Sequence, residues 1–280
     1  PTTTDKVPNT SATAASSGSD LNGMAVREAC NQLVERLKPV AADLLGVADP
    51  VFAVESMGER PMVGDEPAWA WSEGRAVTFS KVATEAYMRQ IQLSATGYYS
   101  TPDIAYDRQR GQGKPFHYYA YGVGVSEVEV NGLTGEWRLL RMDILHDVGA
   151  SLAADIDIGQ VEGAFVQGLG WMTTEELVFS DDGSLLTHSP STYKIPAIGD
   201  VPADFRVKLL DRAAQPDVIY GSKAVGEPPF MLAIGTHIAI SRAASAFGTR
   251  GTDVAVAVPA TTEAILFAVE EARQSATSES

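Results

Sequence analysis

One glutamate in the C-terminal half of the chain is placed to act as a base. Glu227 stands in the segment GSKAVGEPPF (221–230), with Gly226 before it and two prolines after it. Proline fixes φ and suits the first turn of a helix, so these prolines predict a helix that begins just beyond the carboxylate. Gly226 would let a ligand approach closely. The alternative is that Glu227 only caps the helix or complements its dipole, a common surface role.

A glutamine and the histidines are the other side chains that could bind or react. Gln160 closes DIDIGQ (155–160) and either holds a polar ligand through its amide or is an ordinary first-turn residue of the next helix. His146 precedes Asp147, and we expect a buried hydrogen-bonded pair. None of the four histidines is paired at HxxxH spacing, and we expect no protein ligand to a metal. No Walker A motif or GxSxG elbow is present.

Mixed helices and strands must position these residues. Apolar residues at helical spacing predict a helix from Leu21 to Leu45, with Asp20 as N-cap and Gly46 at its end. Segment 49–74 reads as a surface insertion with one short strand. Further helices are predicted over 80–89, 161–172, 230–247 and 261–272, and strands over 51–54, 93–99, 116–130, 137–145 and 205–210, with a hairpin over 177–186. Without a regular βαβ rhythm, the fold class is α+β.

Both ends of the chain are rich in small polar residues. By composition, residues 1–19 favour a linker or disordered tail, and the alternative is a loop lying close against a ligand. Residues 274–280 are predicted to be a disordered tail. Because the chain starts at Pro1 rather than Met, we expect a processed, cleaved or separately encoded piece of something longer.

Composition excludes several partners. The chain has 280 residues and a net charge of −15, which argues against nucleic acid and against anionic membranes. We expect no membrane span, because no apolar run approaches about 18 residues. The single cysteine, Cys30, excludes an internal disulfide and a cysteine-held Fe–S cluster, and its apolar helical pattern predicts burial. A reducing compartment is permitted, and we predict a cytoplasmic location.

Six strings carry a specific resemblance. They are VPNTSATAASSGSDLNG (7–23), SATGYYSTPD (94–103), HDVG (146–149), DIDIGQVEGAFVQGLGWMTTEEL (155–177), STYKIPAIGDVPADFRV (191–207) and GSKAVGEPP (221–229). In order and spacing they resemble the molybdenum subunit of the xanthine dehydrogenase family. The resemblance runs from Pro1 to about Phe247 and is confined to the C-terminal part of that subunit. It implies that residues 1–280 are the C-terminal part of a molybdopterin-binding domain, with 1–19 as a cofactor-side loop.

The resemblance also implies a chemistry. In this family a molybdenum–pterin cofactor carries oxo, sulfido and hydroxyl ligands, and the glutamate of the GEPP motif, here Glu227, removes the proton of the metal hydroxyl. The oxygen attacks an electron-poor carbon of hypoxanthine or xanthine, hydride passes to the sulfido ligand, and urate is the final product of this purine catabolism. General-base catalysis of this kind contributes about 10²–10⁴-fold.

Five further residues are implied to contact the cofactor. The TAAS stretch matches a family loop beside the metal and pterin, which places Ala15 and Ser16 at the cofactor with Gly18 nearby. Gln160 matches a glutamine that hydrogen-bonds the pterin, and Gly226 lines the metal site.

The family implies partners as well. They are the N-terminal remainder of the molybdenum subunit, which holds the residues that grip the purine, and 2Fe–2S and FAD modules that pass electrons to NAD. A hetero-oligomer is therefore expected. The alternatives are an aldehyde- or N-heteroaryl-oxidising molybdenum hydroxylase, and a non-catalytic scaffold, which would have no need to keep Glu227.

Overall fold

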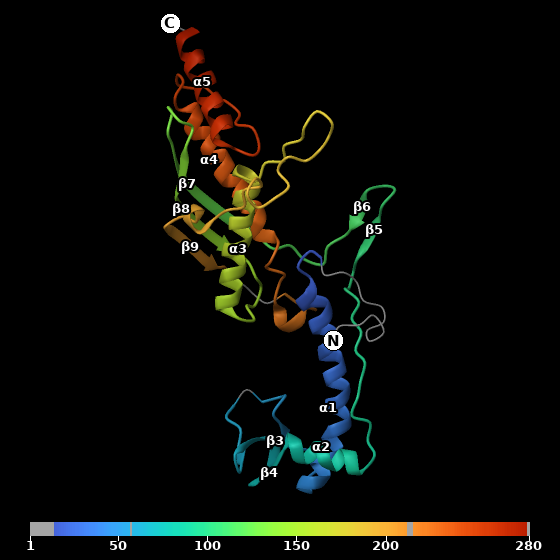
Figure 1. Cartoon of the computed structure of the whole chain (residues 1–280). Helices are drawn as coiled ribbons and strands as arrows, with labels where there is room; N and C mark the ends of the chain where they lie inside the picture. The colour runs from blue at the N-terminus through green and yellow to red at the C-terminus, as the bar shows by residue number, and fades with distance from the viewer. Residues whose placement is uncertain (1–13, 57, 212–214, 279–280) are drawn as a thin grey trace. The chain divides into compact units, whose positions relative to one another are not determined.

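The computed structural model describes residues 14–56, 58–211 and 215–278 (Figure 1). The first thirteen residues of the predicted cofactor-side loop therefore lie outside the described residues. The described chain divides into two compact units. One comprises Leu21–Pro102, and the other comprises the described residues up to Asp20 together with those from Asp103 onward. Helices and sheets occur in both units, which confirms the α+β class.

The Leu21–Pro102 unit contains two helices and a small sheet. A π-helical turn, η1 (Ser19–Gly23), leads into the first helix. The elements are α1 (Met24–Leu45), β1 (Val51–Phe52), β2 (Met62–Val63), β3 (Glu66–Ser72), β4 (Arg75–Thr78) and α2 (Phe79–Met88). Helix α1 ends as predicted, because Gly46 adopts a left-handed φ of 63° there. Asp20 is not its N-cap, since the preceding π-helical turn places Gly23 at that position.

The prediction of a surface insertion over 49–74 is wrong. Strand β3 is the centre of an antiparallel sheet and pairs with β1, β2 and β4. Ala68, Trp69 and Ala70 of β3 are buried, and the Trp69 ring meets Phe52 edge-on with centroids 5.5 Å apart. The polar and glycine residues that suggested an insertion occupy the turns between these short strands, while the apolar residues form a core with α1 and α2.

Two local predictions in this unit are also corrected. Helix α2 is capped by Thr78, whose Oγ1 accepts from the Lys81 amide at 3.2 Å, whereas the predicted cap, Ser80, donates to Glu66 instead. No strand forms over 93–99, where the chain runs along α1. Its carbonyls are bound by α1 side chains, as in the 2.8 Å bond from Arg36 Nη1 to Ser94 O.

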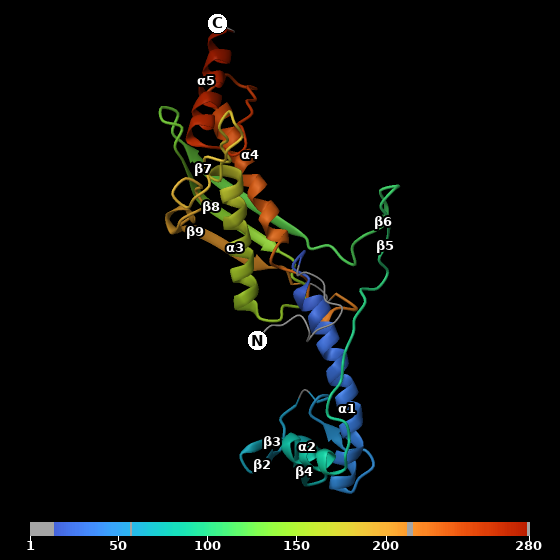
Figure 2. The same ribbon diagram turned by 45° about the vertical axis from the view of Figure 1, so that its right-hand side comes forward.

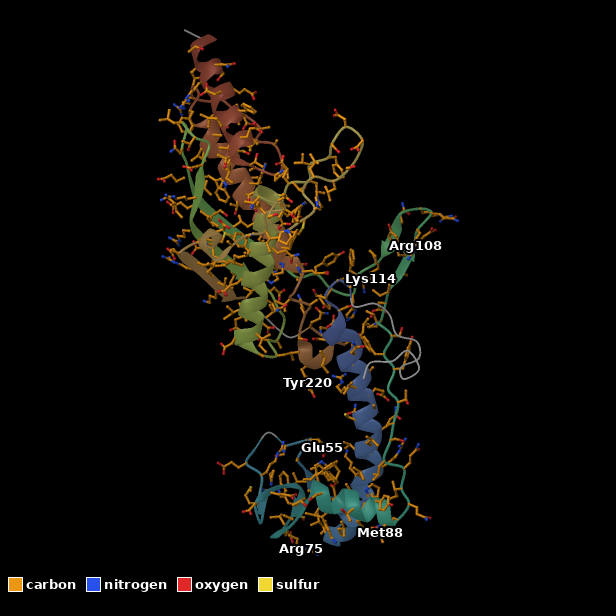
Figure 3. All side chains as sticks on the ribbon, in the orientation of Figure 1. Glu55, Arg75, Met88, Arg108, Lys114 and Tyr220 are labelled. Carbon is orange, nitrogen blue, oxygen red and sulfur yellow. The ribbon has the colours of Figure 1, made fainter. Side chains whose placement is uncertain are left out.

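Side chains on this unit's surface include charged and apolar groups (Figure 3). Lys38 of α1 bridges Glu35 and Glu55. Met88, at the end of α2, is exposed. Cys30 is also exposed, which corrects the expected burial. The buried residues of α1 begin at Leu37, and the residues in the N-terminal half of the helix are exposed or half-buried.

The other unit is built around a three-stranded sheet. Its elements are β5 (Ala105–Asp107), β6 (Gln112–Lys114), β7 (Gly122–Val130), β8 (Trp137–His146), α3 (Ala154–Thr173), η2 (Ile198–Asp200), β9 (Asp204–Leu209), η3 (Ile219–Gly221), η4 (Pro228–Ala233), α4 (Ile234–Ser245) and α5 (Thr262–Ser278). β5 and β6 form a separate hairpin that carries the exposed Arg108 and Lys114 (Figure 3).

β7 and β8 pair antiparallel, as predicted, and β9 joins β8 in parallel. Helices α3 and α4 cover one face of this sheet (Figure 2). On that face Met142 and Ile144 are buried against Phe165 of α3. Ser126 of β7 bonds both Met142 Sδ, at 3.2 Å, and Thr236 of α4, at 2.7 Å.

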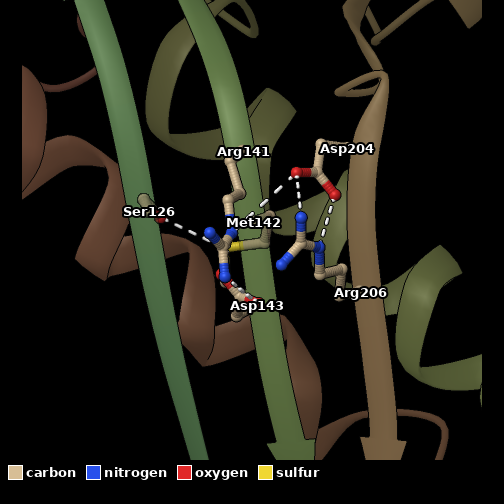
Figure 4. Close-up of polar contacts among 6 residues, drawn as sticks. All are labelled: Ser126, Arg141, Met142, Asp143, Asp204 and Arg206. Atoms are coloured by element: carbon tan, nitrogen blue, oxygen red, sulfur yellow. Dashed lines mark hydrogen bonds and ion pairs between the residues drawn. The ribbon is translucent and has the colours of Figure 1, made fainter.

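The opposite face of the sheet carries an ionic cluster over β8 and β9 (Figure 4). Arg141 lies across from Asp204, and Asp143 lies across from Arg206, so charges of opposite sign alternate over β8 and β9. Arg141 forms two bonds to Asp143, of 2.6 and 2.9 Å, and Arg206 forms two to Asp204, of 2.6 and 2.7 Å. The side-chain alternation of β8 therefore places Met142 and Ile144 in the core and Arg141 and Asp143 in the ionic cluster.

The C-terminal segment is helical further than predicted. Helix α5 runs to Ser278, so the expected disordered tail over 274–280 is wrong for its described part. In this last part of the helix, hydroxyl side chains donate to backbone oxygens one turn earlier, as in the 2.6 Å bond from Ser275 Oγ to Ala272 O. Ser275 also contacts the hydroxyl of Thr252, and Ala272 is fully buried. Among the described residues, no helix is long and apolar enough to cross a membrane.

Candidate functional site

A cavity of about 370 Å³ brings several of the predicted site residues together. Three segments form its walls: the stretch at 16–19, the first turns of α3 with the loop before them, and the segment 222–226. The lining residues are Ser16, Gly18, Ser19, Leu152, Ile156, Asp157, Gln160, Ser222, Lys223, Ala224, Val225 and Gly226. Four of the six predicted site residues are thus at one place, although they come from three distant parts of the chain.

Gly226 is the point at which these walls meet. A Cβ atom on this residue would lie 2.8 Å from Ser16 Oγ and 3.3 Å from Gln160 Oε1. Real Cβ atoms do not tolerate the first distance, so a side chain here would push the hydroxyl and the amide apart. The absence of a side chain at Gly226 therefore lets two polar groups converge on one backbone segment.

The turn that carries Ser16 has an unusual backbone. Ala15 and Ser16 both have a φ of 53°, in the left-handed region that costs L-residues about 1–2 kcal/mol each. The turn is closed by the Ser17 amide and hydroxyl, which donate to Ala14 O at 3.2 and 2.8 Å. Ala15 itself is exposed and does not line the cavity, whereas Ser16 and Gly18 do. Strain of this kind concentrates at functional sites.

Gln160 lies inside α3 rather than at its start. The helix begins at Ala154, seven residues before the predicted Val161, so Gln160 is in its second turn. It lines the cavity together with Ile156, four residues earlier on the same face of the helix. The alternative interpretation of Gln160 as a first-turn residue is therefore wrong.

Glu227 follows Gly226 directly and is exposed, but it is not among the residues that line the cavity. It occupies the N-cap position of η4, with Pro228 and Pro229 as the next residues, as predicted. Its side chain makes no capping hydrogen bond. The capping alternative for Glu227 is therefore wrong, while its alternative role of complementing the helix dipole stays a prediction.

A buried ion pair fixes the segment that leads to Glu227. Lys223 Nζ lies 2.7 Å from Asp147 Oδ2, and the two side chains are 7% and 0% exposed. Lys223 also donates to Tyr119 O at 2.8 Å, and the Gly149 amide donates to Asp147 Oδ1 at 2.9 Å. The backbone is joined as well, since the Lys223 amide donates to Val148 O at 2.8 Å. These bonds therefore fix the loop after β8 and the segment 221–227 relative to each other.

The expected burial of the neighbours His146 and Asp147 is confirmed. Both residues are buried, but the Asp147 carboxylate is occupied by Lys223 and the Gly149 amide. Within the described residues, His146 Nδ1 has no hydrogen-bond partner. Burial lowers the pKa of the His146 imidazole, against the opposing effect of Asp147.

A tyrosine connects the N-terminal stretch to the same segment. Tyr118 donates its hydroxyl to Asp20 Oδ2 at 2.5 Å and accepts from the Ala224 amide at 2.7 Å. Burial raises the pKa of the Asp20 carboxyl, and the bond from Tyr118 opposes that rise.

Sequence reasoning did not assign Asp20, Tyr118, Asp147 or Lys223 to the site. The available signal was that Asp147 and Lys223 lie within the strings HDVG and GSKAVGEPP.

Comparison with known proteins shows the family to which the chain belongs. The family model of the molybdopterin cofactor-binding domain matches residues 1–202. The chain is 48% identical over 242 residues to the xanthine dehydrogenase/oxidase of Felis catus, covering 86% of this chain and 16% of the relative. It is 44% identical over 248 residues to the xanthine dehydrogenase of Dictyostelium discoideum, covering 88% and 16%. The expected family is confirmed, and the chain spans about a sixth of these relatives' length.

The fold is similar to a solved enzyme structure. Quinoline 2-oxidoreductase from Pseudomonas putida 86 superposes with a TM-score of 0.73 at 25% identity, over 92% of this chain and 31% of that one.

Proposed function

Because this chain belongs to the molybdopterin cofactor-binding domain family, we propose that it forms part of the active site of a xanthine dehydrogenase. The observation that carries the proposal is the convergence of Ser16 and Gln160 on Gly226. These are residues that the family resemblance assigns to the cofactor, and here they line one cavity. The reaction proposed is hydroxylation of hypoxanthine and xanthine to urate.

The cavity fits a molybdenum–pterin group. Such a group is polar and needs hydrogen-bond donors and acceptors, which the Ser16 hydroxyl and the Gln160 amide supply. Gly18 and Gly226 expose backbone that a planar ring can approach, and Ala15 lies beside Ser16 in the strained turn. When bound, the group supplies the oxidising metal and the hydroxyl that is transferred. The protein supplies position and proton transfer.

Glu227 acts as the general base in this proposal. A carboxylate next to Gly226 that makes no capping bond can accept the proton of the attacking hydroxyl through one of its Oε atoms. The ion pair between Lys223 and Asp147 holds the backbone four residues before it. A fixed backbone limits the positions that the base can sample, and proton transfer depends on that distance.

The remaining parts of the enzyme lie outside this chain. We propose that the rest of the molybdenum subunit grips the purine, and that 2Fe–2S and FAD modules carry electrons to NAD in a cytoplasmic hetero-oligomer. The chain spans 16% of the length of the xanthine dehydrogenases that it resembles, and the proposal assigns the purine-binding and electron-transfer parts to the remainder of such an enzyme. The same reasoning predicts that the isolated chain will not retain molybdenum.

A second candidate is an N-heteroaryl-oxidising molybdenum hydroxylase. The structural similarity to quinoline 2-oxidoreductase favours it, while the higher identity to xanthine dehydrogenases favours the first.

The test is to purify the complete enzyme with its associated chains, measure molybdenum and pterin, and compare turnover of xanthine, quinoline and an aromatic aldehyde. Xanthine as the preferred substrate supports the proposal. Preference for quinoline supports the N-heteroaryl-oxidising candidate, and preference for the aldehyde supports an aldehyde-oxidising hydroxylase instead. Absence of molybdenum and pterin contradicts all three.

A further inference from the structure

The side-chain hydroxyl of Tyr118 bonds both Asp20, which follows the stretch at 16–19, and the segment before Glu227. Its oxygen lies 2.5 Å from Asp20 Oδ2 and 2.7 Å from the Ala224 amide. The hydroxyl donates its proton to the carboxylate and accepts from the amide, so its two bonds are compatible with each other. Tyr118 comes from the stretch before β7, and its partners are 98 and 106 residues away in the sequence.

Both partners are close to the cavity wall. Asp20 lies four residues after Ser16 of the strained turn. Ala224 lies two residues before Gly226 and itself lines the cavity. Ser16 and Gly226 are the residues whose close approach leaves no room for a Cβ. A bond from one tyrosine oxygen to both segments therefore sets the spacing between two walls of the proposed cofactor site.

The surroundings of Tyr118 restrict its movement. Lys223 Nζ lies 5.9 Å from the centre of the Tyr118 ring, and the same ammonium is bound by Asp147. The His117 ring meets the Tyr118 ring edge-on, with centroids 6.0 Å apart. Because these contacts hold the ring, the hydroxyl keeps one position and fixes the distance between Asp20 and Ala224.

We propose that Tyr118 is a positioning residue for the cofactor site, acting through its hydroxyl on the Ser16 and Gly226 walls. This inference rests on the proposed function. The bond to a backbone amide also holds Ala224, three residues before the base, so its loss should affect the reaction itself as well as cofactor binding.

The test is Tyr118→Phe in the complete enzyme, which removes the oxygen and keeps the ring. We expect kcat per bound molybdenum to fall about two- to tenfold, the range given by one net hydrogen bond. KM for xanthine should stay within about twofold, because the proposed purine-gripping residues lie elsewhere. Hydrogen exchange of the peptide containing Ala224 should become faster, which is a readout independent of turnover.

Tyr119→Phe is the matched control. Tyr119 is exposed, its hydroxyl has no hydrogen-bond partner within the described part of the chain, and its backbone carbonyl still accepts from Lys223. It should behave as the wild type. If Tyr118→Phe lowers only the fraction of enzyme loaded with molybdenum, or matches Tyr119→Phe in every readout, the positioning role is refuted. If the wild-type enzyme carries no molybdopterin, the proposed function fails first and this inference fails with it.

Discussion

Lys223 and Asp147 form an ion pair of 2.7 Å in the interior of the protein, with side chains 7% and 0% exposed. Burying two charges carries a desolvation cost, which is repaid only where further hydrogen bonds satisfy both groups. Tyr119 O and the Gly149 amide provide those bonds here. The pair connects the loop after β8 to the segment that carries the proposed base, so its integrity bears on both stability and catalysis.

Asp147→Asn should destabilise the protein by about 3–5 kcal/mol, the usual cost of leaving one partner of a buried pair uncompensated. The measurement is the free energy of unfolding in denaturant. Asp253→Asn is the control, because Asp253 pairs with Arg242 on the surface at 3.4 Å, with side chains 75% and 71% exposed. Such a pair contributes about 0–1 kcal/mol. Equal effects of the two substitutions would show that the burial of Asp147 has no energetic consequence.

Gly226→Ala should weaken cofactor retention without unfolding the protein. The added Cβ would meet Ser16 Oγ at 2.8 Å and Gln160 Oε1 at 3.3 Å. Both atoms end movable side chains, so they can shift, but they then leave the cavity wall. The measurement is molybdenum and pterin content after gel filtration, for which we expect a clear loss.

Gly159→Ala is the matched control for that substitution. Gly159 stands next to Gln160 in α3, and a Cβ there would have no atom within 4 Å. Alanine is favoured over glycine inside a helix by about 0.5–1 kcal/mol, so this variant should retain cofactor and be slightly more stable. Cofactor loss in Gly159→Ala as large as in Gly226→Ala would sink the steric explanation.

Stability should depend on pH through His146. Burial lowers the pKa of this imidazole below its unfolded value of 6.5, so the unfolded state binds the extra proton more readily. The contribution of neutral His146 is fully present above that value and is lost as the pH falls toward the folded pKa. The midpoint of thermal unfolding should therefore drop between about pH 7.5 and 5.5.

His146→Leu should remove much of that dependence, because it deletes the titrating group at a site where Nδ1 has no partner among the described residues. His188→Gln, at an exposed position, should leave it unchanged. If the unfolding midpoint of His146→Leu still falls with pH as in the wild type, other groups cause the dependence.

Local sequence signals predicted the elements whose ends are set locally. Helix α1 ends at Gly46 because a left-handed residue is needed there, and β7 and β8 alternate clearly around a turn. Ser80 and Thr78 are both hydroxyl residues two positions apart, so composition could not decide which caps α2. The central role of β3 depends on pairing with three short strands, which no single window of sequence contains.

The candidate site, like the fold, could be predicted from the sequence only in part. The resemblance named Ser16, Gly18, Gln160 and Gly226, and the structure places them around one cavity. It could not reveal that Lys223 pairs with a residue 76 positions away, because that contact exists only once β8 and the segment before Glu227 are packed together.

The most direct test of the account is turnover per bound molybdenum in Glu227→Gln. The substitution keeps the size of the side chain, and Glu227 is exposed without a capping bond, so folding and cofactor content should stay near wild type. Loss of a general base should lower kcat about 10²–10⁴-fold. A variant that binds molybdenum normally and keeps more than about a tenth of wild-type turnover would contradict the assignment of Glu227 as the base.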